Sequence, residues 1–261
     1  MKDKQGVIKT EAQERLQRWV EHFGEILNRD VPMNPVEEDE GEELEDIEEI
    51  DLGRWRIQEV KNALKMTKRG KAEGVDEVGP DLLRADMGNT ASRLARCYNR
   101  LWESEKWPQV WKKGLIAKIF KKRDLRDCNN WRGVTFLSVI SKIFCRMMLE
   151  RIKIGIHNGS TTEQIFSLKN ILEQAIEWRE GLYIHLVDFE KAFDSVRRES
   201  LWNIMRSYGI PGRMVRVIAD IYEDFECAVI DGSETSDWFK IKSGVTQRCV
   251  MSGFLFLLAL D

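Results

Sequence analysis

The stretch that decides the interpretation of this sequence is residues 182–195, which run Leu-Tyr-Ile-His-Leu-Val-Asp-Phe-Glu-Lys-Ala-Phe-Asp-Ser. Its apolar run from Tyr183 to Val187 is rich in strand-forming residues and ends at the carboxylate of Asp188. A buried strand that presents an Asp at its end can hold a divalent cation, because the strand fixes the backbone while the carboxylate reaches water and substrate. The pattern predicts a central strand with a metal-binding Asp188, and it also fits a strand followed by an Asp that caps a helix.

The composition predicts a globular chain with a basic body. Hydrophobic residues make up 43% of the 261 positions, enough for a sizeable core, and the formal net charge is −3. Eleven of the 44 acids lie in residues 37–51, which contain no Lys or Arg. The other 33 acids face 41 bases, a net charge of +8, which is compatible with a polyanionic partner.

Five widely spaced cysteines without a Cys-x-x-Cys pair indicate a reducing compartment rather than a disulfide framework or zinc site. The sequence shows no signal peptide and no apolar run long enough to cross a membrane, which predicts an intracellular protein.

Hydrophobic periodicity divides the chain into three parts: an N-terminal helical segment (1–30), an acidic and partly disordered linker (31–54), and the remaining body (55–261). The helix at 161–179 is apolar enough for an interior position. Helices are predicted at 10–29, 56–67, 80–85, 90–104, 138–152, 161–179, 198–207 and 211–224, and strands at 114–120, 225–231 and 236–242.

Basic residues cluster around the strand at 114–120 and the turn that follows it. They are Lys118, Lys121, Lys122 and Arg132. Bases on a hairpin that faces a carboxylate site would suit a triphosphate, although a solvated basic turn would look the same. The loop at 68–81, with its three glycines and early bases, could also contact phosphate.

The order of these pieces resembles the reverse transcriptase of non-LTR (LINE-type) retrotransposons. The segments that carry the resemblance are Arg18-Trp-Val-Glu-His-Phe, residues 68–76, Asn130-Trp-Arg-Gly-Val with Ser141-Lys-Ile-Phe, Thr162-Glu-Gln-Ile, residues 187–196 and residues 244–256. The resemblance implies an α+β fold: the fingers and partial palm of a right-hand polymerase, with an antiparallel sheet flanked by helices, preceded by the N-terminal helix and acidic linker.

The resemblance also implies roles for single residues. Asp188 would be the catalytic carboxylate and the ligand of Mg²⁺, which activates the primer hydroxyl and neutralises the triphosphate. The implied nucleotide-binding residues are Lys118, Arg132, Phe189, Phe193 and Gln247, with Phe193 under the ribose. The implied partners are an RNA template, a DNA primer and deoxynucleoside triphosphates.

The sequence departs from the family pattern at its C-terminal end. Arg248 and Gly253 stand where the family has Gly and Pro, and the family's Tyr-x-Asp-Asp hairpin has no match in residues 1–261. We therefore expect a C-terminally truncated fragment of an RNA-directed DNA polymerase that is catalytically incomplete.

Three alternatives differ in class. One is a non-catalytic nucleic-acid-binding module, and one is an unstable relic whose function is only inherited. The last is another Mg²⁺-dependent phosphoryl-transfer enzyme that uses Asp188 and Asp194.

Overall fold

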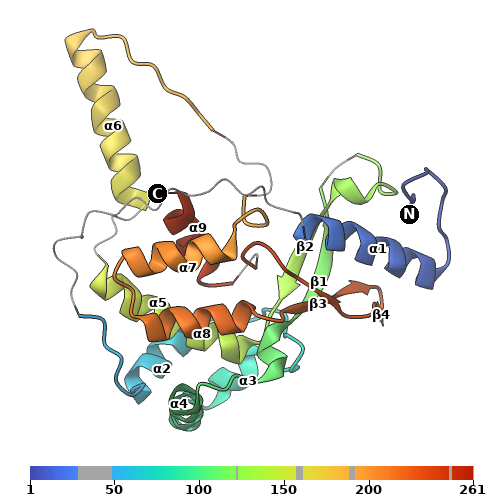
Figure 1. The fold of residues 1–261 in the computed structure, drawn as a ribbon, viewed down its shortest axis with the longest axis horizontal. Helices are drawn as coiled ribbons and strands as arrows, with labels where there is room; N and C mark the ends of the chain where they lie inside the picture. Colours follow the sequence, from blue (N-terminus) through green and yellow to red (C-terminus); the bar gives the residue numbers. More distant parts are fainter. Residues whose placement is uncertain (29–48, 122, 157–160, 188–191, 247–248, 261) are drawn as a thin grey trace.

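A computed structural model describes residues 1–28, 49–121, 123–156, 161–187, 192–246 and 249–260 (Figure 1). The α-helices are α1 (Ala12–Leu27), α2 (Ile57–Lys65), α3 (Pro80–Ala85), α4 (Met87–Ser104), α5 (Val139–Gly155), α6 (Thr161–Trp178), α7 (Arg198–Ser207), α8 (Gly212–Tyr222) and α9 (Ser252–Leu260). The strands are β1 (Lys113–Phe120), β2 (Trp131–Phe136), β3 (Glu226–Asp231), β4 (Glu234–Thr235) and β5 (Phe239–Lys240), and short 3₁₀ turns occupy Gln109–Lys112 and Cys128–Asn130. The fold is α+β, with a sheet flanked by helices.

The sheet is mixed, which corrects the prediction of an antiparallel sheet. Its strand order is β2-β1-β3-β4, and β5 also pairs with β3. Strands β1 and β2 form an antiparallel hairpin, whereas β1 and β3 run parallel. Parallel pairing is possible because α5 to α8 separate the two strands in the chain and return it to the same end of the sheet.

The predicted hairpin that begins with β3 is present but shorter. β3 turns tightly around Gly232, whose φ is +68°, into the two-residue β4. The chain then leaves the sheet and returns only at β5, which pairs with the first residues of β3. Residues 236–242 therefore do not form one continuous strand, as the sequence predicted.

Two hydrophobic clusters hold the molecule together. The first lies between α1 and the sheet and contains Trp19 and Phe23 of α1 against Ile116, Cys227 and Val229 of β1 and β3. The second is helical and collects buried residues from α2, α4, α5, α7, α8 and α9. Figure 1 shows α1 and the sheet on one side of the molecule and these helices on the other.

The helical cluster is centred on Phe144 of α5, which is fully buried. Aromatic rings surround it with centroid distances of 5.0 to 6.4 Å; they belong to Trp55, Tyr98, Trp102, Trp107 and Trp111. Buried aromatic side chains remove large apolar areas from water, so this group is a major source of the stability of the helical part.

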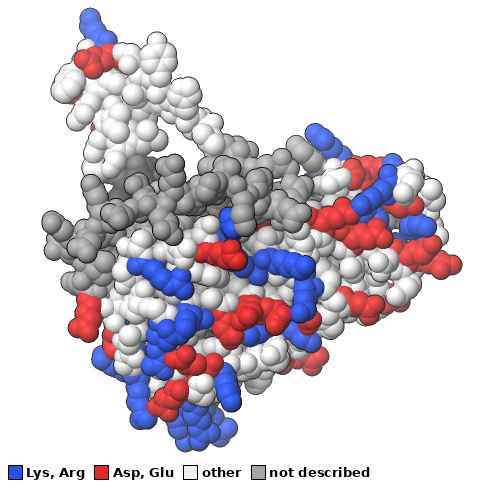
Figure 2. Space-filling view, viewed as in Figure 1, with Lys and Arg blue, Asp and Glu red and all other residues white. Residues whose placement is uncertain are grey.

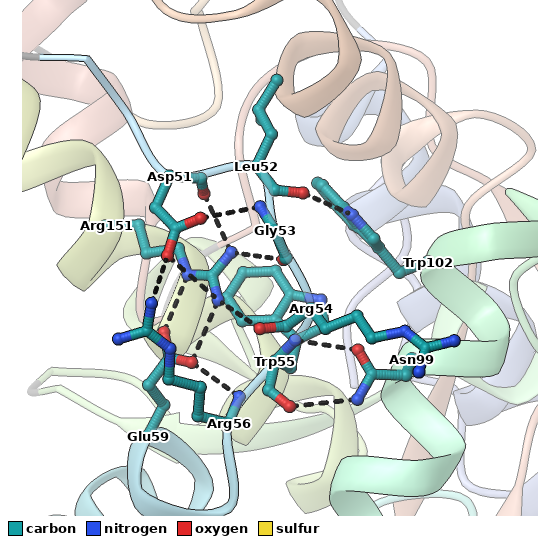
Figure 3. Close-up of polar contacts among 10 residues, drawn as sticks. All are labelled: Asp51, Leu52, Gly53, Arg54, Trp55, Arg56, Glu59, Asn99, Trp102 and Arg151. Atoms are coloured by element: carbon teal, nitrogen blue, oxygen red, sulfur yellow. Dashed lines mark hydrogen bonds and ion pairs between the residues drawn. The ribbon is translucent and has the colours of Figure 1, made fainter.

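The buried Arg151 of α5 joins the chain before α2 to the helical core (Figure 3). Its Nε and Nη2 donate to both carboxylate oxygens of Glu59 at 2.7 and 3.0 Å. Its other bonds go to main-chain carbonyls of Asp51, Gly53 and Arg54, at 2.8 to 3.1 Å. All five donors are used, so this buried charge is fully compensated, and the last residues of the predicted acidic linker are docked on the body.

The predicted strand at 183–187 is wrong. These residues have no regular secondary structure and are exposed, with Leu186 93% accessible. Strand-forming side chains make a strand only where a neighbour supplies hydrogen bonds. The central strand β1 already has β2 on one edge and β3 on the other, so it offers no edge to this segment.

The predicted interior position of the helix at 161–179 is also wrong. Phe166, Ile176 and Trp178 of α6 are exposed, and Figure 1 shows α6 projecting away from the other helices. The helical cluster is built without any described side chain of α6, so its apolar residues have no core to enter. Within the described residues, no helix is long and apolar enough to span a membrane.

Candidate functional site

A cavity of about 620 Å³ lies where α1, the β1–β2 hairpin and the chain before α7 meet. Phe23, Ile26 and Leu27 of α1 give it an apolar wall. Its remaining lining comes from the sheet, the segment 192–194 and the loop after β5: Ile116, Lys121, Trp131, Arg132, Gly133, Thr135, Ala192, Phe193, Asp194, Arg198, Phe225, Cys227, Ile241, Ser243, Val245 and Thr246. Polar and apolar groups both line it, and a concave site of this size is the usual form of a small-molecule site.

Main-chain hydrogen bonds hold the loop after β5 against residues 192–196. Gly244 N donates to Val196 O at 2.9 Å, and Val245 N donates to Phe193 O at 2.8 Å. Gly244 has φ +72°, and a Cβ there would lie 2.7 Å from both Cα of Asp194 and O of Phe193. Only glycine fits this backbone and this approach, which explains a glycine at the start of the 244–256 motif.

Arg198 holds the same loop through hydrogen bonds to main-chain carbonyls. Its Nε donates to Gly244 O at 2.9 Å, and Nη1 donates to Tyr222 O at 2.8 Å and Ile241 O at 3.1 Å. Burial lowers the pKa of Arg198, because desolvation disfavours its charged form. Among the described residues the guanidinium has no ion-pair partner; main-chain carbonyls accept its hydrogen bonds, so it positions the loop that leads to Gln247.

The charged groups of the cavity come from two sides. Lys121 and Arg132 lie on the exposed hairpin, and both side chains are accessible to solvent. Asp194 is buried, and it is the carboxylate found among the described lining residues. The site thus places two accessible cations across from an acid-bearing segment, an arrangement that can accept an anionic ligand at its mouth.

The structure brings together two of the predicted nucleotide-binding residues and separates a third from them. Arg132 and Phe193 both line the cavity, and the Phe193 ring also packs against Phe256 of α9 at a centroid distance of 4.9 Å. Lys118 does not line it. Asp188, Phe189 and Gln247 lie outside the described residues, so their predicted roles stay predictions.

Lys118 joins α1 to the sheet. Its Nζ forms a short ion pair with Asp231 of β3 and lies 5.0 Å from the centroid of the Trp19 ring. Arg15 of α1 binds the other oxygen of Asp231 at 3.2 Å. Burial opposes ionisation of Asp231, but the hydrogen bonds from Lys118 and Arg15 outweigh it and lower the pKa of Asp231.

The described residues do not by themselves supply a set of magnesium ligands. Among them, no three His, Cys, Asp or Glu side chains gather closely enough to hold a metal ion. Mg²⁺ prefers carboxylate and water oxygens in octahedral geometry, and the described cavity lining offers the one carboxylate of Asp194.

Sequence reasoning missed the contributions of α1 and of Arg198. The apolar positions of α1 predicted a helix packed on a core, which is correct, but nothing local showed that Phe23, Ile26 and Leu27 also line a cavity. Arg198 follows another arginine at the start of a helix, and no local pattern distinguishes the arginine that binds the loop from its neighbour.

Comparison with known proteins gives the family. The protein-family model for reverse transcriptase (RNA-dependent DNA polymerase) matches residues 119–261, which is more than half of the chain. The matched region contains the β1–β2 hairpin turn, the cavity segment 192–194 and the loop at 244. Because the match covers more than half of the residues, the chain belongs to the reverse transcriptase family.

Individual relatives come from transposons and other mobile elements. The chain is 25% identical over 216 residues to a probable RNA-directed DNA polymerase from transposon BS of Drosophila melanogaster, covering 77% of the chain and 24% of the relative. It is 25% identical over 224 residues to the RNA-directed DNA polymerase from mobile element jockey of the same species, covering 79% and 24%. It is 24% identical over 218 residues to an uncharacterized 149 kDa protein of transposon TX1 from Xenopus laevis, covering 78% and 17%.

These matches confirm the resemblance to reverse transcriptases of non-LTR retrotransposons. The chain spans about a quarter or less of the length of these relatives.

Proposed function

We propose that this chain carries the nucleotide-binding part of an RNA-directed DNA polymerase, with an RNA template and a DNA primer as partners. The observation that supports it is the cavity, which collects Arg132, Phe193 and the Gly244 loop from three separate parts of the chain. Those are the parts in which the family motifs lie.

Each lining group suits a part of a deoxynucleoside triphosphate. Arg132 and Lys121 would neutralise the phosphates at the accessible rim, because a guanidinium binds phosphate oxygens with two parallel hydrogen bonds. Phe193 would lie under the sugar, where its bulk would exclude a 2′-hydroxyl. The apolar wall from α1 would exclude water from the bound nucleotide.

We further infer that residues 1–261 alone do not extend a primer. Phosphoryl transfer of this kind uses two metal ions, and Asp188 is a single predicted ligand. No Tyr-x-Asp-Asp sequence occurs among the 261 residues to supply the additional carboxylates.

The binding proposal is tested with a fluorescent deoxynucleoside triphosphate. Arg132→Gln should weaken binding by tenfold or more, since a lost charged hydrogen bond costs about 1.5–3 kcal/mol. The matched control is Arg123→Gln, which removes the same charge from the exposed turn of the same hairpin and should change affinity by less than about twofold. Equal affinities for wild type and Arg132→Gln would refute the placement of the triphosphate.

The inactivity proposal is tested by primer extension on an RNA template with Mg²⁺. We expect no product from the wild-type chain. Extension by the wild type that disappears in Asp188→Ala would show that the chain completes its own metal site.

A non-catalytic nucleic-acid-binding module remains the alternative. It is favoured by the net charge of +8 outside residues 37–51. In that case RNA binding would persist while Arg132→Gln and wild type bound the nucleotide equally weakly.

A further inference from the structure

Helix α4 presents a row of three arginines to solvent. Arg93, Arg96 and Arg100 are all exposed, while Leu94, Tyr98 and Trp102 on the opposite side are buried in the helical cluster. At 100° per residue the three arginines lie within about 60° of one another around the helix axis. Their Cα atoms are spaced by about 4.5 and 6 Å along it.

The arginine row is not neutralised by the described acids around it. Within the described residues, none of the three arginines forms an ion pair; Arg93 and Arg96 make hydrogen bonds of 3.4 Å to the preceding turn of α4. The neighbouring acids have other partners. Glu103 binds Arg54 at 2.8 Å, and Asp86 accepts from Asn89 N at the start of α4.

The positive charges of the three arginines therefore repel one another. Arg96 and Arg100 stand four residues apart, where like charges destabilise a helix by about 0.2–0.5 kcal/mol per pair. A helix can hold such a row because its other face is anchored by burial. A bound polyanion would convert the repulsion into attraction.

Further bases lie near the N-terminal end of α4. The last residue of α2, Lys65, is exposed, and the loop after it carries three more exposed bases, Lys68, Arg69 and Lys71. Arg84 of α3, which directly precedes α4, ties this loop in place through Lys65 O at 3.1 Å and Thr67 O at 2.5 Å. Figure 2 shows Lys and Arg gathered at the lower edge of the molecule, where Figure 1 places α4 end-on.

We propose that the α4 arginine row, Arg93, Arg96 and Arg100, binds the phosphate backbone of a nucleic acid strand outside the cavity. None of the three lines the cavity, so this surface is separate from the nucleotide site. A row of guanidinium groups on one helix face suits a chain of phosphates, and it does not read bases. The proposal rests on the proposed function only for the nature of the polyanion.

The test measures binding of a fluorescent single-stranded RNA to the full chain by anisotropy at several salt concentrations. The triple variant Arg93→Gln, Arg96→Gln, Arg100→Gln should bind more weakly at low salt. Its slope of log affinity against log salt should be shallower by about 2, since each phosphate contact on a single strand contributes about 0.7. Replacing the same three arginines by Lys should keep most of the slope.

A matched control separates this surface from a general charge effect. Lys153, Arg179 and Arg206 are exposed on other elements, and changing all three to Gln removes the same net charge. This control should keep the wild-type slope. If the control and the α4 variant lose equal amounts, or if neither changes the slope, the proposal is overturned.

Two further outcomes are distinguished. A polyglutamate peptide that competes more strongly than RNA of equal length would indicate an acidic protein partner and would also overturn the proposal. Failure of the cavity proposal would appear differently, as unchanged nucleotide binding in Arg132→Gln with the α4 effect on RNA intact. Thermal melting of each variant confirms that the substitutions at exposed positions leave the fold unchanged.

Discussion

At the scale of single residues, the site depends on groups that hold backbone rather than contact a ligand. Gly244 lets two main-chain segments approach closely, and Arg198 satisfies the carbonyls of the loop that contains it. Arg151 does the same for the chain before α2. Each of these residues is costly to replace because its neighbours would be left strained or with buried polar groups unpaired.

Substituting Gly244 should separate the loop from the cavity segment. Gly244→Ala adds a Cβ where φ is +72° and backbone atoms lie 2.7 Å away, so we expect a loss of about 2 kcal/mol or more in the free energy of unfolding. The control Gly24→Ala adds a methyl group inside α1 with nothing within 4 Å, and should stabilise by up to about 1 kcal/mol. Urea unfolding of both variants measures the change in the free energy of unfolding. No change for Gly244→Ala would contradict the close approach of the Gly244 loop to residues 193–194.

At the scale of elements, α1 is a wall of the cavity as well as a cover for the sheet. Apolar contacts of Trp19 and Phe23 with the sheet hold it in place, and Arg15 of α1 forms an ion pair with Asp231 of β3, which Lys118 of β1 also binds. Lys118, which the family resemblance assigned to the nucleotide, is engaged in this attachment. Loss of the attachment should therefore loosen the cavity as well.

The attachment should depend on pH. The native-state pKa of Asp231 is lowered, so its contribution is complete above the unfolded pKa of about 3.9 and is lost as pH falls through the native-state value. Asp231→Asn should cost about 1 kcal/mol at pH 7, and the difference from wild type should shrink as pH falls below about 4. Urea unfolding across this range measures it.

The exposed Asp237 supplies the control for that measurement, because Asp237→Asn should leave stability unchanged at every pH. A difference for Asp231→Asn that stays constant with pH would mean that packing, and not the ion pairs, attaches α1.

At the scale of the whole molecule, the described chain has two buried hydrophobic clusters and a periphery whose apolar residues are exposed. The helical cluster and the α1–sheet cluster are complete without α6 and the extended residues 183–187. The apolar residues of that periphery are accessible, although their composition alone would place them inside. Composition sets how much apolar surface a chain can bury, and tertiary contacts decide which part is buried.

This division predicts that the same substitution destabilises the core strongly and the periphery little. Ile218 of α8 is 1% accessible, and Ile218→Ala should cost about 2–5 kcal/mol. Ile176 of α6 is 77% accessible, and Ile176→Ala should cost less than about 0.5 kcal/mol. Chemical denaturation of the two variants measures the difference, and a cost for Ile176→Ala close to that for Ile218→Ala would show that α6 belongs to the core.

The sequence by itself determined the positions of the helices and the family. Periodic apolar residues and Pro80 are local signals, and helices α1 to α8 lie within a few residues of the predicted ranges, whereas α9 was not predicted. The family motifs are local too, which is why their order along the chain was enough to identify a reverse transcriptase.

Only the tertiary structure decided which strands pair and which residues meet at the cavity. The parallel pairing of β1 with β3, the exposure of residues 183–187 and the engagement of Lys118 by Asp231 all join or separate residues far apart in the chain. The composition of a strand does not show which strand it pairs with, and the sequence around a cation does not show which acid it binds. These pairings depend on packing and hydrogen bonds between segments far apart in the sequence, which local sequence patterns do not specify.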